Sequence, residues 1–522
     1  MNRRTFIAAS AGALVAPRAS QAAEASITVL TNEPIGTISP LLHGHFVEHL
    51  GGVVYDGIWV GENSKIPNIA GLRKSLVDAL KKINAPVFRW PGGCFADSYD
   101  WKDGVGPRDK RPTRTNFWIR SLRKDTPDGP SKYDPNTFGT NEFMRFCKEI
   151  GAEAYLAANV RGGTPRDFNE WVEYCNSPEN STTWARVRGG APFNVQYWGI
   201  GNESWGCGGD FTPEEYSVEF RKFTSWVPAF GTPLRYIPAG PNSGDLNWSR
   251  GFFSSLNAKS PRLLSRVWGW ALHYYCRTEG TGEALDFTTD QYYELLGKAD
   301  RMESLVTGHW AVMGEFDREH RVKLVVDEWG AWHKQGADTP PHLLFGYNTT
   351  MRDALVAAIT LDTFHRHAGK ISMANVAQLA NCIHSLFLTY EDKFLVSPNY
   401  HVFDMYKDHH NGQAVRAVFG APGAPKQTPG LAGSASLKGK TLVVTCSHAH
   451  HDQTHPVEIS VPGARIASAR AEILGGTDAK AHNTFAQPDQ VKPHSANASV
   501  SGSVIRLDLP PVSVAKIVAE LA

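Results

Sequence analysis

Short apolar runs alternate with amphipathic stretches between about residues 40 and 385. The amphipathic stretches predict helices, for example over 69–84, 141–150, 213–229, 290–315 and 350–368. The apolar runs have the length and the β-branched content of buried strands. They are 41–48, 86–93, 153–160, 195–202, 235–241, 269–275, 323–329 and 373–380. This alternation predicts the α/β class and a (β/α)8 TIM barrel, with a doubly wound open sheet as the structural rival.

The pattern changes after residue 400, where apolar and polar residues alternate and Gly/Pro-rich turns intervene. The alternating stretches are 414–419, 433–447, 456–461, 464–474 and 502–519. Such alternation predicts a C-terminal antiparallel β-sandwich of the jelly-roll type. An early strand at 25–31 is expected to join it, because this strand precedes the barrel. The predicted organisation is an N-terminal strand at 23–39, a catalytic barrel at 40–396 and a sandwich at 397–522.

Residues 1–22 have the pattern of a processing signal. Arg3-Arg4 precedes the apolar run 6–16, and small residues follow up to Ala22. We therefore predict a twin-arginine signal peptide and an exported enzyme, periplasmic or secreted. Proteins exported on this route are already folded, and the seven cysteines form no C-x-x-C motif. Mostly free thiols are expected.

Charge excludes two classes of partner. There are 53 basic and 52 acidic residues, which leave a formal net charge of +1. No overall field favours nucleic acid or an anionic membrane. We expect neither as a partner.

Two carboxylates lie at the ends of predicted barrel strands, where catalytic residues are expected. Catalytic groups of such barrels come from the carboxyl ends of the strands. Glu203 follows the fourth predicted strand, and Glu328 lies at the end of the seventh. Two facing carboxyls are what glycosidic cleavage requires, since one donates a proton and the other attacks or activates water. Asn202 can bind a sugar hydroxyl, Tyr275 can orient a carboxylate, and His273 either holds a neighbouring group or is a core histidine.

Two histidine-rich motifs suggest metal chemistry, but their contexts argue against it. His45-x-x-Glu48-His49 matches a zinc-peptidase string. It falls on a strand end rather than on a helix that would place both histidines on one face. Residues 448–455 (HAHHDQTH) nearly match a metallohydrolase motif with the wrong spacing, and they are expected to form a surface hairpin loop with at most adventitious metal binding.

Several segments resemble glycoside hydrolase family 51, the α-L-arabinofuranosidases. They are GHFVEHLGGVVYDGIWVG (44–61), RWPGGCFADSYDWKDGVGPRDKRP (89–112), WGIGNESWGCGG (198–209), VVDEWGAW (325–332) and MANVAQLANCI (373–383). The resemblance runs from about residue 40 to 409 and is weaker in the sandwich.

The resemblance implies a retaining double displacement without metal or organic cofactor. Glu328 would be the nucleophile and Glu203 the acid/base. The positions implied to bind the furanose are Glu48, Cys94, Asn202, His273, Tyr275 and Gln378. Some members of the family have Asn where Cys94 stands, so the backbone of residues 93–94 is the alternative contact there.

The expected activity is therefore that of an exo-acting α-L-arabinofuranosidase, which releases terminal arabinofuranose from arabinoxylan, arabinan or their oligosaccharides. One rival is an endo-β-glucanase or β-xylosidase on the same scaffold. The other, from a different class, is a non-catalytic carbohydrate-binding protein, which has no use for a carboxylate pair. By analogy with the family, a homo-oligomer is expected.

Overall fold

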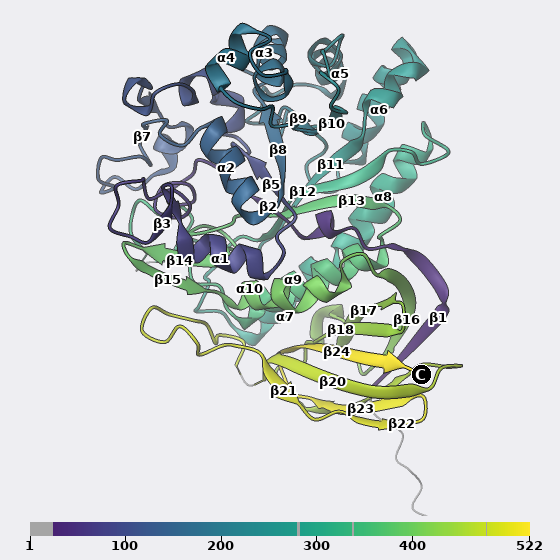
Figure 1. The fold of residues 1–522 in the computed structure, drawn as a ribbon. Helices are drawn as coiled ribbons and strands as arrows, with labels where there is room; N and C mark the ends of the chain where they lie inside the picture. Colours follow the sequence, from purple (N-terminus) through teal and green to yellow (C-terminus); the bar gives the residue numbers. More distant parts are fainter. Residues whose placement is uncertain (1–24, 279–281, 337–338, 477) are drawn as a thin grey trace, which may run out of the picture.

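Eight parallel strands form a nearly closed barrel (Figure 1) in the computed structural model, which describes residues 25–278, 282–336, 339–476 and 478–522. The strands pair in chain order, and β10 reaches β11 through a parallel bridge between Tyr236 and Val267. They are β2 (Gly44–Phe46), β5 (Val87–Trp90), β8 (Glu153–Ala158), β9 (Tyr197–Ile200), β10 (Arg235–Pro238), β11 (Gly269–Cys276), β12 (Lys323–Ala331) and β13 (Ile371–Val376). This confirms the predicted TIM barrel. The predicted signal segment, residues 1–22, lies outside the described residues.

Helices surround the barrel, and their ends follow from local sequence. For example, Thr212 caps α5 through its hydroxyl, Pro213 occupies the first turn, and Glu215 completes a capping box. The predicted helix 290–315 contains two helices that meet at Arg301. The helices are α1 (Lys74–Lys82), α2 (Thr140–Ile150), α3 (Pro165–Asn176), α4 (Thr183–Arg188), α5 (Pro213–Phe223), α6 (Leu246–Lys259), α7 (Thr289–Asp300), α8 (Met302–Gly314), α9 (Met351–Arg366) and α10 (Pro398–Tyr406). Within the described ranges, no helix combines the length and apolar character needed to cross a bilayer.

A separate, curled ten-stranded sheet lies below the barrel in Figure 1, in the order β21-β20-β24-β18-β17-β16-β1-β19-β23-β22. Its pairs are antiparallel except β1 with β19. The predicted strand 433–447 is two strands, because Gly439 turns the chain at a φ of 61° that an alternation pattern does not reveal. The strands are β1 (Ala25–Thr37), β16 (Gln413–Gly420), β17 (Leu431–Lys438), β18 (Thr441–His448), β19 (His455–Ser460), β20 (Ile466–Gly475), β21 (His494–Ala496), β22 (Ser499–Ser501), β23 (Val504–Leu509) and β24 (Ser513–Leu521).

Strand β1 belongs to the interior of the sandwich although it comes first in the chain. It pairs antiparallel with β16 from Ser26 to Thr37 and parallel with β19 from Ala25 to Thr28. Its alternate residues Ile27 and Val29 are fully buried in the sandwich core. The sandwich is therefore built from both ends of the described chain.

Helix α9 forms the seam between the barrel and the sandwich. It is buried along almost its whole length and packs on β17 and β18. Asp362 of α9 accepts hydrogen bonds from the hydroxyls of Ser434 and Thr445, each at 2.7 Å. Three shorter hairpins decorate the barrel. They are β3 (Asn68–Ile69) with β4 (Leu72–Arg73), β6 (Arg114–Thr115) with β7 (Tyr133–Asp134), and β14 (Phe387–Tyr390) with β15 (Lys393–Val396).

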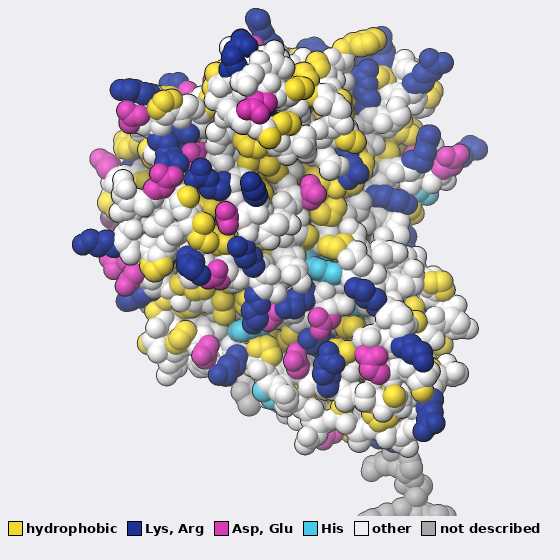
Figure 2. Space-filling view, in the orientation of Figure 1, with side chains coloured by type: hydrophobic (Ala, Val, Ile, Leu, Met, Phe, Trp, Pro, Cys, Tyr) yellow, Lys and Arg dark blue, Asp and Glu magenta, His cyan; other side chains and the backbone are white. Residues whose placement is uncertain are grey.

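Basic and acidic side chains are interspersed on the face of the molecule seen in Figure 2. This mixture agrees with the nearly balanced count of charged residues. A binder of nucleic acid concentrates its basic side chains on one face. The visible face has no such arrangement.

Candidate active site

Two carboxylates lie close together at the carboxyl-terminal mouth of the barrel. Glu328 lies in β12, and Glu203 follows the end of β9. His273 of β11 lies beside both, with Nδ1 3.0 Å from Oε1 of Glu203 and 3.6 Å from Oε2 of Glu328. One oxygen of each carboxylate and a ring nitrogen of His273 all lie within 4.8 Å of one another. The two acids are therefore near enough to act on one bond.

The two carboxyls have different surroundings. Arg89 donates to Oε1 of Glu328 at 2.7 Å, and the Tyr275 hydroxyl donates to Oε2 at 2.7 Å. Burial alone would raise the pKa of Glu328, but the charges of His273 and Arg89 bring this pKa below its usual value. The side chain of Glu328 is 7% exposed, against 19% for Glu203. Glu328 is thus held as a buried carboxylate, while Glu203 is more open.

Local backbone geometry aims Glu203 into the mouth. The side chain of Asp97 accepts a hydrogen bond from the backbone N–H of Asn202 at 2.9 Å. The carbonyl of Glu203 then accepts from the backbone N–H groups of Gly206 and Gly208. Glu203 itself has a φ of 40°, a left-handed value that is uncommon for residues other than glycine. Such outliers persist where the surrounding structure enforces them, often at functional sites.

Arg89 is a site residue that the sequence pattern did not single out. It is buried in β5, where one Nη donates to Glu328 and the other donates to Oδ1 of Asn202 at 2.6 Å. Burial opposes its charge, but Asp327 and Glu328 more than compensate and raise the pKa of Arg89 above its usual value. A charged residue inside an otherwise apolar strand was the available signal, because a buried charge needs a partner.

Glu48 and Gln378 form a second polar group, at the junction of the first and last barrel strands. Gln378 Nε2 donates to Oε2 of Glu48 at 2.8 Å. Oε1 of Glu48 accepts from the backbone N–H of Phe95 at 3.0 Å and from Trp118 Nε1 at 3.2 Å. Burial and the negative charge of Glu328 raise the pKa of Glu48 to about 7. This carboxyl can therefore accept from a hydroxyl or, when protonated, donate to one.

Cys94 is not a free thiol. It forms a disulfide with Cys207, which is 113 residues away in the sequence. The sulfur of Cys207 lies 3.8 Å from Oε2 of Glu203, so the bridge borders the carboxylate pair. A disulfide has no S–H, and a hydrogen bond donated by the Cys94 thiol is therefore impossible in this state. The other five cysteines are free and buried, in agreement with the expectation of mostly free thiols.

Both ring nitrogens of His49 have hydrogen-bond partners within the protein. Its Nδ1 lies 2.6 Å from Oδ2 of Asp134, and its Nε2 accepts from Trp90 Nε1 at 3.0 Å. His45 is fully buried on β2 and stacks on Phe88. The H-x-x-E-H string therefore supplies no pair of histidines aimed at a common point.

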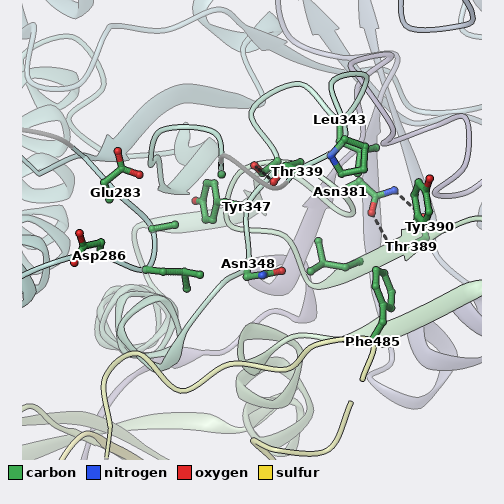
Figure 3. Close-up of a pocket in the computed structure, with 16 residues that line it drawn as sticks. Glu283, Asp286, Thr339, Leu343, Tyr347, Asn348, Asn381, Thr389, Tyr390 and Phe485 are labelled. Atoms are coloured by element: carbon green, nitrogen blue, oxygen red, sulfur yellow. Dashed lines mark hydrogen bonds between the residues drawn. The ribbon is translucent and has the colours of Figure 1, made fainter. Parts of the chain in front are cut away.

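A cavity of about 510 Å³ has a lining that includes none of the predicted site residues. Figure 3 shows Glu283 and Asp286 at one end of it and Tyr390 and Phe485 at the other. Both acidic side chains pair with lysines. Each of the two carboxylates that line this cavity is therefore paired with a lysine, unlike the neighbouring carboxylates at the barrel mouth.

Known proteins resemble this chain over most of its length. Residues 79–237 match the family model described as the α-L-arabinofuranosidase 1 domain, and residues 327–513 match the α-L-arabinofuranosidase C-terminal domain. An enzyme of Bacteroides ovatus, named an intracellular exo-α-L-arabinofuranosidase, is 33% identical over 504 residues, which cover 94% of each chain. The crystal structure of a GH51 arabinofuranosidase from Xanthomonas axonopodis pv. citri has a TM-score of 0.89 and 34% identity. It covers 95% of this chain and 100% of that one.

The comparison corrects the prediction of export. The Bacteroides ovatus relative is named intracellular. So is an exo-α-(1→5)-L-arabinofuranosidase of Acetivibrio thermocellus, which is 30% identical over 69% of this chain and 71% of its own. The predicted signal peptide and the periplasmic or secreted location are therefore wrong. An Arg-Arg pair before a short apolar run is a weak signal, because few residues define it.

Proposed function

Because the chain belongs to glycoside hydrolase family 51, the α-L-arabinofuranosidases, we propose that Glu328 and Glu203 carry out a retaining double displacement. The chain is a glycoside hydrolase, and the comparisons establish its α-L-arabinofuranosidase class. The observation that carries the proposal is the short distance between the two carboxylates, within 4.8 Å. Retaining enzymes have carboxyls about 5 Å apart, whereas inverting enzymes need roughly 6.5–9.5 Å to admit a water.

In the first step, the Glu328 carboxylate attacks the anomeric carbon of a terminal arabinofuranosyl unit. Glu203, as a carboxylic acid, gives its proton to the departing glycosidic oxygen. The products are a glycosyl ester on Glu328 and the free alcohol of the leaving group. In the second step, the Glu203 carboxylate takes a proton from water, which attacks the same carbon and releases Glu328. Two inversions leave the anomeric configuration unchanged.

The surrounding polar side chains would hold the sugar. Glu48, Gln378 and Asn202 are buried beside the carboxylates and offer groups that match sugar hydroxyls. Arg89 is a positioning residue, because it fixes both Glu328 and Asn202. Relatives named exo-α-L-arabinofuranosidases support release of a terminal unit over cleavage within a polymer. Arabinoxylan, arabinan and their oligosaccharides are the proposed substrates, and self-association stays a prediction.

Product analysis tests this proposal. We expect hydrolysis of an aryl α-L-arabinofuranoside, with an α-configured first product by NMR, because the double displacement retains configuration. Arabinoxylan should yield free arabinose. A β-configured first product would contradict the nucleophile assignment. Cello-oligosaccharides from glucan, with no arabinose from arabinoxylan, would favour an endo-glucanase.

His273→Asn is expected to shift the acid limb of the pH profile of kcat/KM to higher pH. Burial disfavours a charged His273, but Glu328 and Glu203 raise the pKa of this imidazole and so favour its charged form. This cation lowers the pKa of Glu328. Without it, Glu328 takes up a proton at higher pH and loses its nucleophilicity there. An opposite charge at such a distance shifts a pKa by at least about one unit, which sets the expected displacement.

The matched control is His494→Gln, on the exposed strand β21, which should leave the profile unchanged. An acid limb that stays in place or moves to lower pH in His273→Asn would show that His273 does not set the ionisation of Glu328.

A further inference from the structure

The histidine-rich segment 448–455 lies in the sandwich, outside the catalytic site described above. His448 ends β18, His455 begins β19, and His450 lies in the connection between them. The sequence pattern predicts a surface loop here. Instead, these three side chains are buried, at 1%, 7% and 4% exposure for His448, His450 and His455, while His451 between them is exposed. Burying three imidazoles together is unfavourable unless their ring nitrogens form hydrogen bonds or bind a metal.

The three buried rings converge on one point. Their centroids lie 4.6–5.3 Å apart. His448 Nε2 and His455 Nδ1 are 2.8 Å apart. One ring nitrogen from each of the three lies within 4.8 Å of those of the other two. A tetrahedral zinc ion holds nitrogens at 2.0–2.1 Å, so its ligand atoms are separated by about 3.3 Å. Small ring rotations would bring the three nitrogens to that spacing.

Backbone carbonyls behind the cluster orient two of the rings. His448 Nδ1 lies 2.8 Å from the carbonyl of Pro510, and His450 Nε2 lies 3.2 Å from the carbonyl of Pro422. A neutral imidazole donates from one nitrogen and keeps a lone pair on the other. Donation to these carbonyls leaves the lone pairs on Nε2 of His448 and Nδ1 of His450. Histidine ligands of metals characteristically have such a carbonyl on the second nitrogen.

Burial also favours the neutral form of one of the three imidazoles, that of His448. Burial lowers the pKa of His448 to about 4, and the neighbouring His455 and His450 act in the same direction. Neutral imidazole is the form that coordinates zinc, copper and nickel. At neutral pH no proton needs to leave His448 before a metal binds.

We propose that His448, His450 and His455 form a binding site for one divalent transition-metal ion of the zinc class. Three histidine ligands leave one position of a tetrahedral ion for water or a small anion. The site lies on the sandwich, whereas the catalytic carboxylates are on barrel strands. Its role is therefore structural rather than catalytic.

The location explains what such an ion would stabilise. It would join the end of β18 to the start of β19, which residues 449–454 link in the chain. The same connection contacts α7 of the barrel, since Tyr292 donates to the carbonyl of Ala449 at 2.9 Å and Tyr293 contacts His451. Metal binding would thus hold a sandwich turn and its contact with the barrel together. A ligand that binds only the folded state raises the melting temperature.

Titration of the untagged, chelator-treated full chain with Zn²⁺ tests the proposal. We expect one equivalent to bind and to raise Tm, with kcat unchanged. His450→Gln and His455→Gln should each weaken Zn²⁺ binding at least about a hundredfold, because loss of an outer partner alone typically costs 10–100-fold. His494→Gln is the matched control. Glu328→Gln should keep the Zn²⁺ site, which separates it from the group formed by Glu203, His273 and Glu328.

A spectrum of the wild-type chain provides a readout that needs no variant. Co²⁺ in place of Zn²⁺ should give the intense visible absorption of a tetrahedral ion. The proposal is overturned if no saturable binding occurs, if Co²⁺ stays octahedral, or if binding survives both His450→Gln and His455→Gln. The last result would mean adventitious binding elsewhere on the surface.

Discussion

Glu328→Gln is expected to lower kcat on an aryl α-L-arabinofuranoside by about 10⁴-fold or more, the loss typical when an enzyme's nucleophile is removed. The amide has no negative charge with which to attack the anomeric carbon, so the glycosyl-enzyme cannot form. Gln has nearly the volume of Glu, and Tyr275 and Arg89 remain to pack against it. Steady-state rates and mass spectrometry for a covalent sugar adduct measure the effect.

Two controls make this result specific. The melting temperature of Glu328→Gln should lie somewhat below that of the wild type at neutral pH, because the lowered pKa of Glu328 means that its charge stabilises the fold. The loss of activity is specific if the variant is still folded at the assay temperature. Glu319→Gln, whose side chain is 80% exposed, should retain full activity. If Glu328→Gln kept more than a tenth of the wild-type kcat, another group would have to be the nucleophile.

Glu203→Ala should show a loss that depends on the leaving group. A poor leaving group such as a sugar alcohol needs the proton of Glu203, and general acid catalysis is worth about 10²–10⁴-fold. A dinitrophenolate leaves without that proton, so the first step should be nearly normal with an activated aryl glycoside. Hydrolysis of the intermediate then lacks its base, and the glycosyl-enzyme should accumulate after a burst of dinitrophenol.

Azide distinguishes the acid/base role from general damage to the site. It needs no deprotonation, so it should accelerate turnover of the activated substrate by Glu203→Ala and yield an arabinofuranosyl azide of α configuration. With azide and the same substrate, Glu328→Gln should not form the azide product of retained configuration, and its turnover should not be accelerated. Equal losses in Glu203→Ala for good and poor leaving groups, with no azide effect, would remove Glu203 from the acid/base role.

The barrel could be predicted because its strands are buried on both faces. Such strands are short continuous apolar runs, and each of the eight predicted runs overlaps a barrel strand. The ends of the strands were predicted less accurately. The run 41–48 contains only the three-residue strand β2, because apolar residues also fill the turns beside it. The sandwich was harder to divide, since alternation continues through a tight turn such as that at Gly439.

The position of Glu203 and Glu328 at strand ends singles them out in the sequence, and the structure places the two side chains as neighbours. Their catalytic roles stay predictions. Arg89 was not predicted as a site residue because it points inward from the middle of a strand, whereas the predicted residues follow strand ends. The Cys94–Cys207 disulfide was not predicted, because a single sequence does not indicate which cysteines pair when they are 113 residues apart. Both misses involve contacts between distant segments, which periodicity cannot report.

Strand β1 is synthesised long before the strands with which it pairs. A ribosome releases β1 first, but its partners β16 and β19 begin only at residues 413 and 455. During synthesis β1 therefore leaves the ribosome with both hydrogen-bonding edges unpaired while the entire barrel is completed, and unpaired edges invite aggregation. The sandwich cannot begin to assemble around β1 until residue 413 and those that follow it have been translated. A gene fragment encoding only residues 397–522 would lack an interior strand, so the sandwich is not a separable cassette.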